Sequence, residues 1–222
     1  MSPRRSGRSF WALAVAAAWM GSVYFLTTSA FRVLAVLSDD SIREASTGVS
    51  FPAHVKKSQK WVASGVRRKF GKLKVYAMAF YLEESSKLWG SSSVAMRDVL
   101  QEAPGRASLR IVITSSLVST HKLSESLKES LRPRLLKKQS SKQADEVLDA
   151  FLKALMNGPV LKRGTTLRFE FEKASVKIRM GEKYVAEVKS KALTSAFLEI
   201  YLDKHAVAPD FRDAVFKGLS QS

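Results

Sequence analysis

Arg67, in the run GVRRKFG, and Tyr76, in the run KLKVYAM, have side chains with complementary hydrogen-bonding capacity. An arginine offers a planar fork of N–H donors that matches a carboxylate, and a tyrosine hydroxyl adds a neutral donor. We predict Gly65-Val66-Arg67 on a turn and Tyr76 at the start of a long strand, so that both could hold one carboxylate. From composition alone the simpler alternative stays open, with Arg67 a solvated charge and Tyr76 a packing residue of a sheet.

Other chemistries have little support in the sequence. The chain contains no cysteine, which excludes disulfides, thiolate nucleophiles, Cys-ligated zinc and iron–sulfur clusters. His54, His121 and His205 lie far apart without the spacing of a zinc site. A serine elbow GxSxG, a supported Ser-x-x-Lys motif, the phosphate loop and the GxGxxG fingerprint are all missing. We therefore expect no metal, no cofactor and no hydrolase or nucleotide chemistry.

The chain is strongly basic, with 37 Lys and Arg residues against 20 Asp and Glu and a formal net charge of +17. An excess of this size suits nucleic acid, an anionic membrane or an acidic ligand. The bases are spread along the chain, however, and aromatic residues do not interleave with them as in nucleic-acid binders. A well-solvated basic surface is favoured, and no nucleic-acid partner is expected. The modest clusters are Lys56-Lys57-Lys60, Arg67-Arg68-Lys69 and Lys137-Lys138.

Residues 1–46 form a leader that differs from the rest of the chain. Arg4, Arg5 and Arg8 precede the uncharged run 10–26, and the small residues 28–30 follow. This order is that of a secretory signal peptide, and the run is also nearly long enough for a signal anchor that spans a bilayer. The stretch Thr28-Ser29-Ala30-Phe31 resembles the Ala–Phe junction that ends the signal peptides of plastid proteins in algae with secondary plastids. We expect plastid import or membrane anchoring rather than a plain cytosolic protein, and cleavage stays open.

Residues 47–222 are long enough for one domain with a sizeable core. Alternating apolar residues and β-branched runs predict six strands, and apolar stripes predict four helices. Ser119 or Thr120 can cap the first helix. Strands, then helices, then strands, then helices indicate an α+β fold with helices layered on an antiparallel sheet. The expected strands cover 49–52, 72–82, 107–115, 167–172, 176–180 and 184–188, and the expected helices 122–135, 143–156, 193–202 and 210–219.

Three separated runs carry a resemblance to a known family: GVRRKFGKLKVYAMAFYLEE, SLKESLRPRL and AFLEIYLDKHAVAP. They occur in the order seen in the chalcone isomerase superfamily, which the chain resembles from Thr47 to the C-terminus. The resemblance implies the chalcone-isomerase fold, an open-faced β-sandwich in which helices cover one side of a large antiparallel sheet. The family includes isomerases that cyclise a chalcone to a flavanone, fatty-acid-binding members of plastids, and non-catalytic relatives.

Carried over to this sequence, the resemblance favours binding over catalysis. Arg67 matches the arginine that isomerases and fatty-acid binders share at the cleft. Tyr76 stands where isomerases have a catalytic threonine, and a tyrosine there is closer to the fatty-acid binders. Leu123 stands where isomerases have a catalytic tyrosine. Loss of a positioned proton-transfer group typically removes ~10²–10⁴-fold of rate, so flavanone formation is not expected.

Further departures from the isomerase pattern lie at the substrate end of the cleft. Ser130 replaces an asparagine, Ile200 a threonine or serine, and Tyr201 a methionine or isoleucine. The leading hypothesis is therefore a non-catalytic protein that binds a fatty acid or similar apolar carboxylate, and no residue is assigned a catalytic role. An isomerase of the chalcone type (an intramolecular lyase) and a membrane-anchored interaction protein with a vestigial cleft stay open as alternatives. The predicted ligand-binding residues are Arg67, Val75, Tyr76, Met78, Leu123, Leu127, Ile200 and Tyr201.

Overall fold

The structure, a computed structural model, describes residues 40–56 and 58–221. All six predicted strands and all four predicted helices occur within two or three residues of their expected bounds. The strands are β1 (Ser41–Arg43), β2 (Ser50–Pro52), β3 (His54–Val55), β4 (Gln59–Lys69), β5 (Leu73–Glu83), β6 (Ala107–Ile113), β7 (Thr166–Phe171), β8 (Ser175–Met180) and β9 (Lys183–Lys189). The helices are α2 (Met96–Glu102), α3 (Thr120–Leu136), α4 (Ser141–Met156), α5 (Lys191–Leu202) and α6 (Pro209–Ser220).

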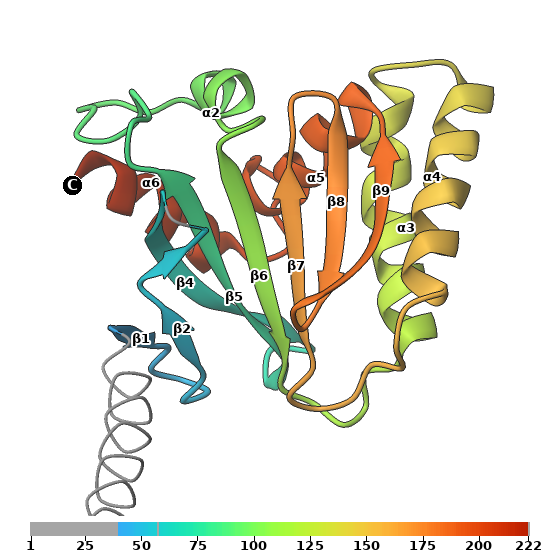
Figure 1. Cartoon of the computed structure of the whole chain (residues 1–222), viewed down its shortest axis with the longest axis horizontal. Helices are drawn as coiled ribbons and strands as arrows, with labels where there is room; N and C mark the ends of the chain where they lie inside the picture. Colours follow the sequence, from blue (N-terminus) through green and yellow to red (C-terminus); the bar gives the residue numbers. More distant parts are fainter. Residues whose placement is uncertain (1–39, 57, 222) are drawn as a thin grey trace, which may run out of the picture. The chain divides into compact units, whose positions relative to one another are not determined.

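A seven-stranded antiparallel sheet organises the fold, with its strands in the order β3-β4-β5-β6-β7-β8-β9. Neighbouring strands in the sheet are also neighbours in the chain, so helical segments enter as insertions after β5, after β6 and after β9. Helices α5 and α6 lie behind the sheet in Figure 1, and α3 and α4 pack together at its β9 side. The expected α+β fold, a large antiparallel sheet covered by helices, is confirmed.

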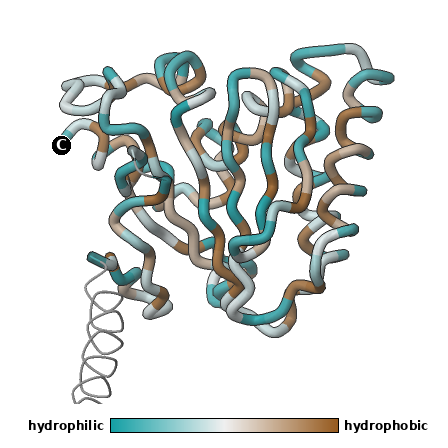
Figure 2. The backbone as a smooth tube through the Cα atoms, in the orientation of Figure 1, coloured by the Kyte–Doolittle hydropathy of each residue, from teal (hydrophilic) through white to brown (hydrophobic). Residues whose placement is uncertain are grey.

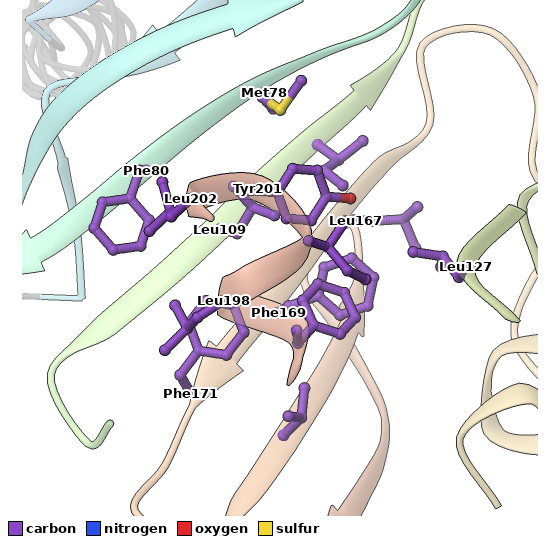
Figure 3. Packing of buried hydrophobic residues seen from close by; sticks show 14 of the residues in the cluster. Met78, Phe80, Leu109, Leu127, Leu167, Phe169, Phe171, Leu198, Tyr201 and Leu202 are labelled. Atoms are coloured by element: carbon purple, nitrogen blue, oxygen red, sulfur yellow. The ribbon is translucent and has the colours of Figure 1, made fainter. Parts of the chain in front are cut away.

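The main core lies between the sheet and the helices, and it contains buried side chains of α3, α4, α5 and α6. Leu198, Tyr201 and Leu202 of α5 face side chains of β5, β6 and β7 (Figure 3). At its centre the Phe197 ring stands within 4.6 to 6.0 Å, centroid to centroid, of four other aromatic rings. Ser190 caps this helix, because its side chain accepts a hydrogen bond from the Leu193 amide. The cap and the aromatic cluster fix α5 against the sheet.

The prediction of a turn at Gly65-Val66-Arg67 is wrong, because these residues lie inside β4. This strand pairs with β5 over almost its whole length and places Arg67 opposite Tyr76. A glycine and three consecutive basic residues lowered the apparent strand propensity of the segment. A glycine is needed at position 65 for packing, because a Cβ there would come within 2.9 Å of the Phe211 Cβ on α6. Helix α6 thus covers the middle of β4, a strand that its own amino-acid composition did not indicate.

Helix α2 and the short strands β1 and β3 were also not predicted. β1 pairs with β2 in a separate two-stranded sheet, so Pro52 ends an edge strand as expected. The compact unit begins at Ser41, ahead of the boundary expected at residue 47. The predictions for the leader fall largely on residues 1–39, outside the described part, and stay predictions. Within the described ranges, helices that combine the length and the apolarity needed to cross a bilayer do not occur.

The sheet face away from α5 is polar over β6 to β9, where hydrophilic and hydrophobic residues alternate along the strands (Figure 2). Glu170 of β7 is buried on this face among three cations. Its carboxylate oxygens lie 2.8 Å from Lys56 Nζ, 3.1 Å from Arg168 Nε and 3.0 Å from Arg179 Nε. Burial alone would raise the pKa of Glu170, but Lys56 and the two arginines outweigh it and hold the pKa below the usual 4.5. Glu170 therefore links the turn after β3 to β7 and β8 as an ionised group.

We expect Glu170→Gln to lower the free energy of unfolding by about 2 kcal/mol at pH 7. The pKa of Glu170 is lower in the folded state, so its contribution is complete above 4.5 and is lost as the pH falls through the lowered value. The difference between wild type and variant should shrink correspondingly in urea titrations below pH 4.5. Glu172→Gln, at a more exposed acid that pairs with Lys177, is the matched control with a loss under about 1 kcal/mol. An equal loss for Glu170→Gln at acid and neutral pH would contradict this role.

Candidate ligand-binding site

A cavity of about 260 Å³ opens at the end of the sheet where β4 turns into β5. Its walls come from that turn and the adjoining ends of β4 and β5, from the loop after β6 and from the first turns of α3. Ser119 positions α3 there, because its hydroxyl accepts from the Lys122 amide at 3.2 Å and caps the helix. The lining residues are Arg67, Lys69, Phe70, Leu73, Val75, Tyr76, Ser115, Leu117, Val118, Lys122, Leu123 and Ser126.

The inner end of the cavity is formed by Arg67, Tyr76 and Ser126. The antiparallel register places Arg67 directly beside Tyr76 on the neighbouring strand. Arg67 Nη1 donates to Tyr76 Oη at 3.2 Å, and Nη2 donates to Ser126 Oγ of α3 at 2.9 Å. Arg67 is only 9% exposed and Tyr76 is fully buried. These two hydrogen bonds fix the orientation of the planar guanidinium between the sheet and α3. The guanidinium retains further N–H donors that are free for a ligand.

Arg67 is a buried cation without a carboxylate partner among the described residues. Burial acts to lower its pKa, but Tyr76, with smaller contributions from Tyr201 and Glu129, outweighs this effect, and the pKa is raised. The guanidinium therefore stays charged at every pH at which the protein folds. A buried charge is costly when unpaired, so this end of the cavity is suited to receive an anion.

A second tyrosine supports Tyr76 from the core side. The hydroxyls of Tyr76 and Tyr201 lie 3.1 Å apart. Burial, and then Tyr76, raise the pKa of Tyr201 well above its usual value, so it remains a neutral phenol. If Tyr201 donates to Tyr76, the Tyr76 hydrogen is free to point at a ligand beside Arg67. In that arrangement the Tyr76 hydroxyl adds one neutral hydrogen-bond donor to those of the Arg67 guanidinium.

The structure brings together four of the eight predicted ligand-binding residues around the cavity: Arg67, Val75, Tyr76 and Leu123. Tyr201 reaches it only through the Tyr76 hydroxyl. The other three are buried in the core and do not line this cavity: Met78, Leu127 and Ile200.

Sequence reasoning did not find Ser126 or the residues at the mouth. Ser126 follows Leu123 by three positions, which places both side chains on one face of α3, and that spacing could have signalled it. Phe70 and Leu117 lie in a turn and a loop, for which apolar periodicity gives no signal. The cavity therefore has a polar inner end, an apolar middle and an outer rim that contains two lysines, Lys69 and Lys122.

This arrangement is suited to bind an apolar anion. The hydroxyls at the inner end are not paired with a histidine or carboxylate base in the described residues, as nucleophilic catalysis would require. Nor does the described part contain a cluster of three metal-ligating side chains. What the side chains can do is hold a carboxylate in a fixed orientation beside an apolar surface.

Comparisons with known proteins identify the family of the chain. A search of curated proteins found no match. Among solved structures, a fatty-acid binding protein of Arabidopsis thaliana matches with a TM-score of 0.69 and 21% sequence identity. The match covers 82% of this chain and 98% of that one, and at this identity it shows the fold. The model of the chalcone isomerase-like family matches residues 45–216. The chain belongs to the chalcone isomerase-like family.

Proposed function

We propose that this protein binds a fatty acid or a similar apolar carboxylate without converting it chemically. The observation that carries the proposal is the buried Arg67 guanidinium at the inner end of an apolar cavity, with Tyr76 and Ser126 as its hydrogen-bond partners and no paired carboxylate in the described part. A ligand carboxylate would supply the missing negative charge. The structural neighbour that is itself named a fatty-acid binding protein lends support.

The bound ligand would lie with its carboxylate inward and its tail toward solvent. Arg67 offers two N–H groups and Tyr76 a hydroxyl to the carboxylate. The tail would pass Val75 and Leu123, which are both buried, and each methylene removed from water contributes about 0.8 kcal/mol. The cavity of about 260 Å³ is near the lower end of the ~300–1,000 Å³ typical of ligand sites. We therefore expect medium-length chains to fit inside and longer chains to reach the mouth.

Leu123 is the residue that argues against isomerase chemistry. It lies on the cavity wall, at the position where the resemblance to the isomerases implies a catalytic tyrosine, and its side chain can neither donate nor accept a proton. The Tyr76 hydroxyl accepts from Arg67 and pairs with the Tyr201 hydroxyl, and neither phenol hydrogen-bonds to a histidine or carboxylate base in the described part of the chain. We expect a chalcone to be bound, if at all, without accelerated ring closure.

The test is the identity of what the full chain carries when it is purified. We expect mass spectrometry to find fatty acids bound in wild type and strongly reduced in Arg67→Met, with Arg68→Met retaining wild-type levels as the matched control. A parallel assay follows the absorbance of a chalcone, which should decay at the rate measured without protein. Absence of fatty acid together with accelerated loss of the chalcone would overturn the proposal and favour the isomerase.

A further inference from the structure

Three connections meet at the end of the sheet where the cavity opens, and we call them the mouth loops. They are residues 68–72, 114–122 and 157–165, along the lower edge of the view in Figure 1. The first two contribute side chains to the cavity. The third is fastened to the second, because the Leu161 amide donates to Thr120 Oγ1 at 3.1 Å and the Gly164 amide donates at 2.8 Å to the carbonyl of Ile113, the last residue of β6. The mouth loops therefore form one continuous surface around the cavity.

Each mouth loop presents a large apolar side chain to solvent. Phe70 is 94% exposed, Val160 82% and Leu117 61%, and these are the three most exposed large apolar residues in the described part of the chain. Phe70 also has a backbone φ of 51°, in the left-handed region that a bulky aromatic residue rarely adopts. An aromatic side chain at the tip of a hairpin, in an unfavourable conformation and without packing, does not stabilise the domain.

The mouth loops are also uniformly positive. They contain no aspartate or glutamate, whereas the connection 84–106, at the opposite end of β5 and β6, carries acidic residues as well as basic ones. The nearby β8–β9 turn carries Glu182, which lies 3.8 Å from Arg168 Nη2. The exposed basic residues of the mouth loops are Arg68, Lys69, Lys72, Lys122, Lys162 and Arg163.

We propose that the mouth loops are a docking surface for an anionic lipid bilayer, into whose interface Phe70, Leu117 and Val160 insert. Exposed apolar tips surrounded by lysine and arginine are the combination that peripheral proteins use, since the tips enter the acyl boundary and the cations meet the headgroups. Each base close to such a surface strengthens binding about fivefold (about 1 kcal/mol). An acidic protein partner would satisfy the cations but not three apolar tips that stand on separate loops.

Docking does not depend on the identity of the ligand, but it gives the proposed function a route for ligand entry. A fatty acid in a bilayer has its carboxylate at the surface and its tail among the acyl chains. With the mouth loops on that surface, the carboxylate would enter first and move toward Arg67 past Lys69 and Lys122. The tail would follow between Phe70 and Leu117 without crossing water. This part of the proposal rests on the proposed function.

The test uses the absence of cysteine, which allows a single environment-sensitive fluorophore to be attached at one chosen position. The full chain is labelled either at Phe70→Cys or at Leu136→Cys. Leu136, 40% exposed at the far end of α3, is the matched control. The apolar run 10–26 can itself attach the chain to vesicles, so the total amount of bound chain does not report on the mouth loops. The comparison is therefore between labels at two positions of the same domain. Circular dichroism verifies that both variants fold.

On vesicles of phosphatidylcholine with phosphatidylglycerol, the label at position 70 should shift to shorter emission wavelength and be quenched by lipids that carry a quencher in the acyl chain. The label at position 136 should stay in water. Replacing both Arg68 and Lys72 by glutamate reverses two charges and so changes the net charge by four units, which should raise the lipid concentration needed for the shift by more than tenfold. Equal behaviour of the two labels, or a shift at position 70 with polyglutamate but not with vesicles, would overturn the proposal while leaving fatty-acid binding untouched.

Discussion

Arg67→Met is expected to lower the affinity for a fatty acid by about 100-fold, which corresponds to about 3 kcal/mol of charge-assisted hydrogen bonding. The alcohol of the same chain length isolates the cause, because it buries the same tail without a charge. In wild type the acid should bind far more tightly than the alcohol, and in Arg67→Met the two affinities should become nearly equal. Isothermal titration calorimetry of both ligands with both proteins measures this ratio.

The same substitution should leave the ligand-free protein almost as stable as wild type. Arg67 is a buried cation, and its removal relieves an unpaired charge while costing the hydrogen bonds to Tyr76 and Ser126. We expect the relieved charge and the lost hydrogen bonds to offset each other, so that the free energy of unfolding changes by less than about 1 kcal/mol. Arg68→Met, at the exposed neighbouring residue, should change neither affinity nor stability. An unchanged preference for the acid in Arg67→Met would show that the carboxylate binds elsewhere.

Phe197→Ala is expected to cost about 4 kcal/mol of unfolding free energy, the largest loss of stability that we predict. The ring is fully buried on α5 and contacts the rings of Phe151, Phe169, Phe171 and Tyr201. Its removal leaves a cavity in the layer between sheet and helix, and four aromatic rings cannot collapse into that cavity without moving strands. Denaturant unfolding followed by circular dichroism gives the loss.

The matched control for Phe197→Ala is Phe70→Ala, the same substitution at the most exposed phenylalanine of residues 40–56 and 58–221, which the structure describes. Its effect on stability should stay within about 0.5 kcal/mol, because nothing packs on that ring. Since Tyr201 contacts both Phe197 and Tyr76, the core variant should also weaken ligand binding at temperatures where it remains folded. A loss for Phe197→Ala below about 1 kcal/mol would mean that the aromatic cluster does not hold α5 on the sheet.

The helices and strands that could be predicted well from the sequence are those in which apolar residues recur with a clear period. Leucines four positions apart predicted α3, and strict alternation predicted β7, because each of these elements buries a single face. β4 was missed, because its outer third is basic and its middle contains Gly65. That glycine is required by the close approach of α6, a tertiary contact that no local pattern records. The order of the strands in the sheet was not predicted, and the resemblance to the family implied only a large antiparallel sheet covered by helices on one side.

The candidate site could be predicted in its centre but not at its edges. Arg67 and Tyr76 were paired correctly from residue type and resemblance, although the pairing arises from strand register rather than from a turn. Ile200 was assigned to the cleft, yet it points into the core, since the cavity ends at the Tyr76 and Tyr201 hydroxyls. The mouth depends on how three loops converge, which is a property of the folded chain.

A structure of the full chain with bound dodecanoic acid tests the central claim most directly. We predict carboxylate oxygens within about 2.7–3.2 Å of the Arg67 guanidinium nitrogens, with the Tyr76 hydroxyl donating to one of them. The first methylenes should lie against Leu123, and the chain should run outward between Phe70 and Leu117. A ligand bound the other way round, with its carboxylate at Lys69 and Lys122 and Arg67 untouched, would contradict the claim.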